Sequence, residues 1–253
     1  KMVLLMWSKF LILTLCWYIS TAAPLEITVF DSALDANGDA AAACGAPSYT
    51  SNNCNFRLAW NYCADTTNWL TSSTKHCIVN IEYTFGGYHI TDGIFDGITV
   101  SNGNVYDFTI SIVGTTDGYP TEIIGMNDQH FLAIDGDSFT GITSNFTMSN
   151  MKFKGFGSLT STGDYGGFKI DTINYVYLSQ VTITEGIGKT GGGMMISNCD
   201  HVFINECLFS SNTATEVING GTGGAIYLNS DSPSGTDYTI TNSNFIFDIV
   251  KLL

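Results

Sequence analysis

The chain has 253 residues, of which only 13% are charged, and 23 acidic residues against 9 lysines and arginines give a net charge of −14. A charge of this sign argues against a protein that binds nucleic acid by neutralising phosphates. The hydrophobic content of 44%, with 16 Phe and 12 Tyr, excludes a disordered chain, and the length fits one large all-β domain or two small ones.

The first predicted element is a secretory signal peptide over residues 1–23. Lys9 precedes an apolar run at 10–19, and small residues at 20–23 end just before Pro24, an order that is typical of signal peptides. A transmembrane anchor is the alternative, but the apolar run is shorter than the ~20 residues that a spanning helix needs. We therefore expect a secreted or cell-surface protein with no membrane span in the mature chain.

Residues 24–89 are predicted to form a Cys-rich N-terminal cap. Within this region, Phe56, Trp60 and Cys63 are spaced i, i+4 and i+7, which indicates a helix with one apolar face. A helix at this place would cover the open first coil of a repeat structure.

Six cysteines remain after the predicted cleavage site, and an even number in an exported chain favours disulfide bonds. They are Cys44, Cys54, Cys63, Cys77, Cys199 and Cys207. The first four allow three connectivities, and for Cys207 a buried free thiol fits the pattern as well as a disulfide to Cys199. A zinc site is the alternative, but the chain has no CxxC or HxxxH pair.

Residues 90–253 are predicted to form a repeat domain. Four segments align without gaps, at 146–153, 176–183, 202–209 and 238–245. Each one alternates apolar and polar residues on both sides of a polar pair, which predicts two short strands separated by a bend. The bend column consists of Asn150, Gln180, Glu206 and Asn242. We expect their polar side chains, which are amides at all positions except Glu206, to cap turn backbone.

A third short strand precedes each copy, at 131–135, 167–171, 193–197 and 225–229. Units of three strands suit a solenoid in which equivalent strands stack ~4.8 Å apart. A propeller is the competing architecture, but its blades need four strands and ~40 residues. After Phe245 the run at 246–253 departs from the repeat pattern, so we expect the domain to be truncated at its C-terminus.

Two short motifs accompany the three-strand units, namely Gly-Gly-Ala-Ile at 223–226 and Phe-Ser-Ser-Asn at 209–212. They resemble the GGAI and FxxN motifs of polymorphic outer-membrane-protein repeats, which belong to the parallel β-helix proteins of the pectin-lyase-like superfamily. Cys-Asn-Phe-Arg-Leu-Ala at 54–59 resembles the CSLREA-type element at the start of many exported β-helix proteins. The resemblance implies an all-β, right-handed parallel β-helix of three-strand coils with an N-terminal capping helix.

The resemblance also implies two functions. Many β-helix proteins cleave acidic polysaccharide, and such a lyase needs a cation and a basic residue, whereas a hydrolase needs carboxylates around one groove. Arg57 is the only arginine, and the chain has no Asp-Asp pair. We therefore expect a non-catalytic module for structure or adhesion at the cell surface, whose partner is a surface polysaccharide or another surface protein. A polysaccharide lyase or glycoside hydrolase acting on acidic polysaccharide is the alternative.

The best candidate for a ligand site is a set of aspartates. Asp135 and Asp171 fall in the same alignment column of successive repeats, and Asp137 is close by. Stacked carboxylates repel unless they share a proton or a cation, so calcium is a candidate ligand, and no other cofactor is expected. Solvated aspartates in turns are the alternative.

Two further features concern sugars. Asn145 begins an Asn-Phe-Thr sequon, which is an acceptor for N-glycosylation in a eukaryotic secretory pathway. Aromatic side chains such as Tyr175, Tyr177 and Tyr227 are candidates for stacking on sugar rings if they are exposed.

Overall fold

The computed structural model describes residues 24–29, 44, 54–82, 87–90, 106–115, 121–125, 131–135, 142–157, 165–215, 223–229 and 237–250. The predicted signal peptide over 1–23 and the candidate calcium ligand Asp137 lie outside the described residues.

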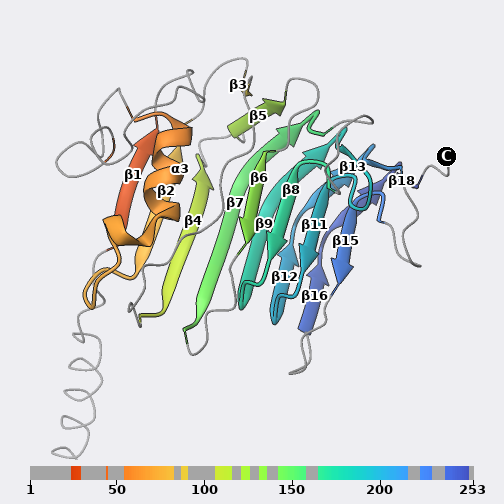
Figure 1. Cartoon of the computed structure of the whole chain (residues 1–253). Coiled ribbons are helices and arrows are strands. Elements are labelled where there is room, and N and C mark those ends of the chain that lie inside the picture. The colour runs from red at the N-terminus through yellow and green to blue at the C-terminus, as the bar shows by residue number, and fades with distance from the viewer. Residues whose placement is uncertain are drawn as a thin grey trace, which may run out of the picture.

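Within the described residues the chain forms three sheets, and all of their strand pairs are parallel (Figure 1). The main path of the eleven-stranded sheet runs through β1 (Leu25–Val29), β2 (His76–Ile81), β4 (Phe108–Gly114), β7 (Ser144–Lys154), β9 (Tyr175–Thr184), β12 (His201–Asn205) and β16 (Asp237–Thr241). The strands beside this path are β3 (Tyr88–Ile90), β5 (Thr121–Gly125), β13 (Leu208–Ser210) and β17 (Asn244–Ile246). These parallel sheets confirm the expected all-β character.

Two smaller sheets complete the described strands. The four-stranded sheet contains β6 (Leu132–Asp135), β8 (Phe168–Asp171), β11 (Met194–Ser197) and β15 (Ile226–Asn229). The three-stranded sheet contains β10 (Ile187–Gly188), β14 (Thr213–Ala214) and β18 (Ile249–Val250). The chain passes from the four-stranded through the eleven-stranded to the three-stranded sheet in the same order in each unit from β8 to β18.

The register of the large sheet follows the gap-free alignment of the four segments. Phe146 pairs with Val176, Val176 with Val202, and Val202 with Tyr238. Because side chains alternate along a strand, Val176 and Leu178 point into the core and are buried. The side chains on either side of them, in turn, form the outer face of the sheet.

A helix forms where the apolar spacing predicted one, and it packs beside the N-terminal strands. Helix α3 (Phe56–Ala64) begins after Asn55, whose Oδ1 accepts a hydrogen bond from Leu58 N at 3.0 Å. The ring of Phe56 stacks on Phe131 at 5.3 Å between centroids, and Trp60 packs edge-on against Phe146 at 6.3 Å. Helix α3 lies beside β1 and β2 in Figure 1, so the large sheet begins within the region predicted as the cap.

The bends between paired strands have left-handed backbone. The predicted bend column is confirmed, with φ angles of 56°, 56°, 54° and 51° at Asn150, Gln180, Glu206 and Asn242. Two further columns share this conformation, and they consist of Thr172 and Asn198, and of Gly155, Glu185, Ser211 and Phe247. The Gln180 amide donates to Glu206 Oε2 at 3.0 Å, so this contact links two bend side chains where a cap on turn backbone was expected.

Replacing Thr172 with asparagine is expected to stabilise the fold by about 1 kcal/mol, because left-handed backbone costs a β-branched residue ~1–2 kcal/mol. Asn198 already occupies the equivalent bend on the next strand. The measurement is the free energy of unfolding in urea. The matched control is Thr182→Asn at an ordinary position of β9, which should lose stability. If Thr172→Asn lowers the free energy of unfolding as much as Thr182→Asn does, this explanation is contradicted.

The strand pairing of the repeat continues after Phe245, although the sequence there departs from the FxxN pattern, and truncation of the domain stays a prediction. Phe245 pairs with Phe209, and β18 continues the three-stranded sheet. Asp248 takes the place that corresponds to Asn212, and its Oδ1 accepts hydrogen bonds from the Asn212 backbone N–H and from Asn212 Nδ2, both at 2.9 Å. An aspartate can substitute here because its carboxylate accepts from two donors at once.

Candidate functional site: an aromatic ridge beside a polar strip

The outer face of the large sheet carries two rows of side chains in register across the strands. One row consists of His76, Thr109, Asn145, Tyr175, His201 and Asp237. The neighbouring row consists of Glu26, Ile78, Ser111, Thr147, Tyr177, Phe203 and Thr239. The rows follow from strand alternation, and their tyrosine and phenylalanine residues all come from β9 and β12.

Tyr175, Tyr177, His201 and Phe203 form what we name the aromatic ridge. Tyr177 stacks on Phe203 with 4.9 Å between centroids and 6° between planes, and Tyr175 stacks on His201 at 4.6 Å and 18°. These separations match the strand spacing, so the rings stand on edge and face their neighbours on the adjacent strand. Tyr175 and Tyr177 are 6.2 Å apart and parallel within 5°, and they therefore stand side by side along β9.

The ridge presents a flat aromatic face toward β7. The strands on that side place Asn145 beside Tyr175 and Thr147 beside Tyr177, so short polar side chains adjoin the two tyrosine rings. Tyr177 remains 40% exposed although its other face is covered by Phe203. On the β7 side, the tall aromatic side chains of the ridge therefore give way to shorter polar side chains.

Thr109, Ser111, Asn145 and Thr147 form what we name the polar strip. Asn145 Nδ2 donates to Thr109 Oγ1 at 3.1 Å, and the hydroxyls of Ser111 and Thr147 share a hydrogen bond of 2.5 Å. His76 Nε2 joins the strip through a 2.7 Å contact to Ser111 Oγ. These bonds fix the orientation of the polar groups next to the ridge.

The environment of His76 favours the neutral form of its imidazole. Burial lowers the pKa of His76, and the charge of Glu26 opposes part of that effect. A neutral imidazole can accept a hydrogen bond from the Ser111 hydroxyl. However, the Ser111 side chain is only 3% exposed, and its strand is paired on both sides in the sheet. The contact between His76 and Ser111 therefore fits a structural network better than an activated nucleophile.

Acidic side chains lie at the starts of β12 and β16, at one end of the first row. His201 Nδ1 lies 3.4 Å from Asp237 Oδ2, and the Asp237 side chain is 79% exposed. Asp200, just before β12, accepts a hydrogen bond from Asn174 Nδ2 at 2.8 Å. The Asn174 Oδ1 in turn accepts from Ser144, which ties the starts of three strands together.

Two of the three candidate calcium residues, Asp135 and Asp171, lie in the four-stranded sheet. The backbone of Asp135 pairs with that of Asp171, as the alignment predicted. Lys169 Nζ lies 3.2 Å from Asp171 Oδ2, and Asn198 Nδ2 donates to Asp171 Oδ1 at 2.9 Å. Burial alone would raise the pKa of Asp171, but the hydrogen bonds from Asn198 and Lys169 outweigh it, and the pKa lies below its usual value.

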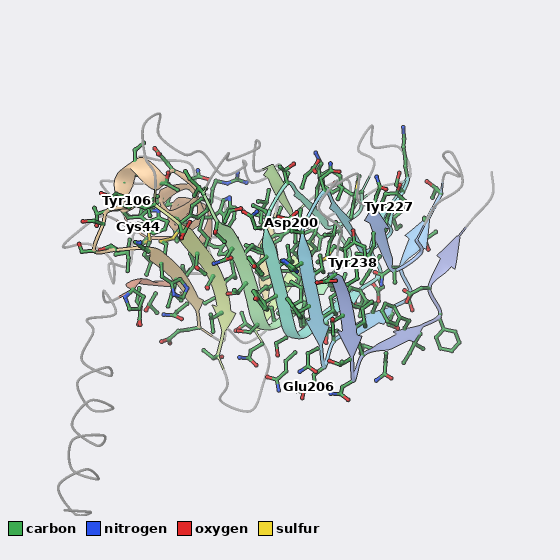
Figure 2. All side chains as sticks on the ribbon, turned by 90° about the horizontal axis from the view of Figure 1, so that it is seen from below. Cys44, Tyr106, Asp200, Glu206, Tyr227 and Tyr238 are labelled. Atoms are coloured by element: carbon green, nitrogen blue, oxygen red, sulfur yellow. A yellow bond between two sulfur atoms is a disulfide. The ribbon has the colours of Figure 1, made fainter. Side chains whose placement is uncertain are left out.

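The described residues contain no group of three or more His, Cys, Asp or Glu side chains placed to hold a metal. Calcium binding by Asp135, Asp137 and Asp171 stays a prediction, because Asp137 is outside the described residues. Glycosylation of Asn145 also stays a prediction. Tyr227, the third tyrosine considered from the sequence, lies on β15 in the four-stranded sheet, away from Asp200 at the start of β12 (Figure 2).

The cysteines divide into bonded and free pairs. Disulfides join Cys44 to Cys54, next to the start of α3, and Cys63 to Cys77, which ties α3 to β2. Cys199 and Cys207 are buried free thiols, so of the two alternatives left open for this pair the structure has the free thiols and not the disulfide. Cys199 lies between β11 and β12 and contacts Ser197 O at 3.2 Å, whereas Cys207 lies between β12 and β13 and contacts Asn205 O at 3.3 Å.

Both free thiols are expected to resist labelling in the folded protein. Burial raises the pKa of Cys199 to about 12, and burial also raises the pKa of Cys207. Because the thiolate is the reactive form, iodoacetamide at pH 8 should modify neither residue until the chain is unfolded in urea. Mass spectrometry of the labelled chain counts the modified thiols. Rapid labelling of either cysteine without urea would contradict the prediction.

Sequence reasoning named Tyr175 and Tyr177 but missed His201 and Phe203. The alignment contained the signal, because 201 and 203 occupy the same columns as 175 and 177 on the next strand. The polar strip was missed because Thr109 and Ser111 lie outside the four aligned segments.

Comparison of the chain with protein-family models finds no matching family, and comparisons with curated proteins and with solved structures find no match either. Across the described ranges, none of the helices has the length and hydropathy needed to cross a membrane.

Proposed function

We propose that the chain is a right-handed parallel β-helix of three-strand coils, with α3 as the cap of its first coil. The repeated order of the three sheets supports this architecture, since each pass from β8 to β18 adds strands to all three sheets in the same order. The three columns of left-handed bends support it too, because they give each pass the same corners. Phe56 and Trp60 of α3 pack against the core where the first strands would otherwise leave it open.

This β-helix serves as a secreted, non-catalytic module at the cell surface, and its partner is a surface polysaccharide. The observation that carries this proposal is the aromatic ridge, which places four stacked rings on the outer face of a rigid sheet. Rings held by their neighbours lose little entropy on binding, and a rigid face with polar groups beside it suits recognition without chemistry.

The test is to express the full chain in a host that can export proteins and to determine where the chain is located and what it binds. Protease treatment of intact cells reports surface location, and retention on insoluble polysaccharide reports binding. Hydrolysis is measured as new reducing ends, and β-elimination as the ultraviolet absorbance of the unsaturated product, on the same polysaccharides. Both signals should stay at the level of a boiled sample. Release of oligosaccharides would overturn the non-catalytic role and support the lyase or hydrolase alternative. A chain that stays inside the cell would overturn the surface role.

A further inference from the structure

We propose that the ligand of the aromatic ridge is an uncharged glycan, whose sugar rings lie against Tyr175 and Tyr177 while their hydroxyls bond to the polar strip. This inference rests on the proposed binding function of the same face, and it names the chemical class of the ligand. Three features of the site carry it, namely the shape of the ridge, the chemistry of the strip and the charge around both.

The shape suits pyranose rings. The apolar C–H face of a pyranose packs on an aromatic face, and Tyr175 and Tyr177 present two such faces side by side, 6.2 Å apart. Their opposite faces are covered by His201 and Phe203, whereas the strand on the other side carries only the short side chains of Asn145 and Thr147, so a ligand can approach the tyrosine rings from the β7 side. Two successive sugars along β9 would each meet one tyrosine.

The polar strip supplies the matching hydrogen bonds. Each hydroxyl of Thr109 and Thr147 has one proton and two acceptor lone pairs, and each makes one bond within the strip, so both keep capacity for a ligand. Ser111 is buried and bonded to His76 and Thr147, so it orients the strip from beneath. A sugar hydroxyl is likewise both donor and acceptor. Since Thr147 lies in register with Tyr177, a sugar stacked on that ring has its edge above the strip.

The charge of the face favours an uncharged glycan over an acidic one. Neither outward row contains a lysine or arginine at any described position, whereas Glu26 and Asp237 stand at their ends. The described lysines of β7 lie beyond the Asn150 bend and are paired, Lys152 with Glu122 at 2.7 Å and Lys154 with Glu185 at 3.4 Å. With a chain charge of −14, a uronate polymer would be repelled.

The predicted sequon competes with this site. Asn145 belongs to the polar strip and is paired in register with Tyr175, so an N-linked glycan there would cover the strip. The binding test therefore uses the full chain made in a bacterial periplasm, where the disulfides form and the sequon stays unmodified.

The experiment is affinity electrophoresis of this protein in gels that contain either neutral polysaccharide (β-glucan, mannan and xylan) or acidic polysaccharide (polygalacturonate and alginate). Retardation is expected in at least one neutral gel and in neither acidic gel. Tyr177→Ala should weaken that binding about tenfold, as for an aromatic anchor of an interface, and Thr147→Val should weaken it several-fold. Tyr227→Ala on the other sheet is the matched control and should bind like the parent.

The outcomes separate this inference from the proposed function. Preference for the acidic gels overturns the uncharged ligand but leaves a polysaccharide-binding module standing. Equal binding by Tyr177→Ala, shown to be folded by circular dichroism, overturns the ridge as the contact. Retardation in no gel overturns the inference, whereas oligosaccharide release overturns the non-catalytic function. The same protein with a glycan on Asn145 should no longer be retarded in the neutral gel. Unchanged retardation of the glycosylated protein would show that the polar strip is not part of the binding site.

Discussion

Replacing Asn212 with alanine is expected to lower the free energy of unfolding by about 3–5 kcal/mol. The Asn212 side chain is fully buried. Its Oδ1 accepts a hydrogen bond from Gly186 N at 2.9 Å, and its Nδ2 donates to Ile183 O at 3.1 Å and to Asp248 Oδ1 at 2.9 Å. One side chain therefore joins three passes of the chain. Alanine leaves a buried N–H and a carbonyl without these partners, and the Asp248 carboxylate keeps only the bond from the backbone N–H of residue 212.

The measurement is urea unfolding followed by circular dichroism. The matched control is Asn244→Ala, because Asn244 is an exposed asparagine on the neighbouring β17 and its loss should stay within about 0.5 kcal/mol. A loss below about 1 kcal/mol at Asn212 would show that water replaces the missing amide.

The variant Asn212→Asp gives the same prediction a pH dependence. Aspartate keeps an acceptor for Gly186 N but places a second carboxylate against Asp248. The shared site raises the folded-state pKa of the pair above the unfolded value, so the folded state takes up protons and the variant gains stability relative to wild type as the pH falls. A stability difference that does not change with pH would contradict this reading of the contact.

The sequence predicted those parts of the fold that repeat. Val176, Val202 and Tyr238 share a column because each pass stacks on the last, and a period in the sequence shows this directly. The bend at Gln180 was also predicted from its column, although glutamine itself carries no signal for left-handed backbone. In these positions the neighbours along the stack determine the conformation more strongly than the residue does.

The N-terminal strands were not predicted, for a related reason. Leu25 pairs with Cys77 across a long stretch of chain, and no repeat marks that partnership. The pairing of Cys63 with Cys77 likewise depends on α3 lying beside β2, which spacing along the sequence does not encode. The polar strip was not predicted because Thr109 and Ser111 come from β4, which precedes the first of the four aligned segments.

The register also explains why so few residues are charged. Every outward position recurs at the strand spacing of ~4.8 Å, so a charged row would stack like charges. The row through Ser149, Ser179, Asn205 and Thr241 avoids this with small polar side chains. The scarcity of charge on this face in turn leaves its aromatic and hydroxyl groups as the means of recognition.

Replacing Phe131 with alanine is expected to lower the free energy of unfolding by about 3–5 kcal/mol. Phe131 is fully buried. Its ring centroid lies 5.3 Å from that of Phe56 of α3, 4.9 Å from that of Phe153 of β7 and 5.2 Å from that of Phe168 of β8. The substitution opens a cavity where the helix meets two sheets, and this junction cannot close without moving α3.

The readout can separate the helix from the sheets. Trp60 and Trp69 are the only tryptophans after the predicted signal peptide, and both are buried in or next to α3. Their fluorescence should therefore report loosening of α3 at lower urea than circular dichroism reports loss of the sheets. Phe131→Leu should recover part of the loss, and Phe247→Ala, at a residue that is 80% exposed, should change stability by less than about 0.5 kcal/mol. If the two transitions of Phe131→Ala coincide and the loss stays under about 1 kcal/mol, the helix does not depend on this ring.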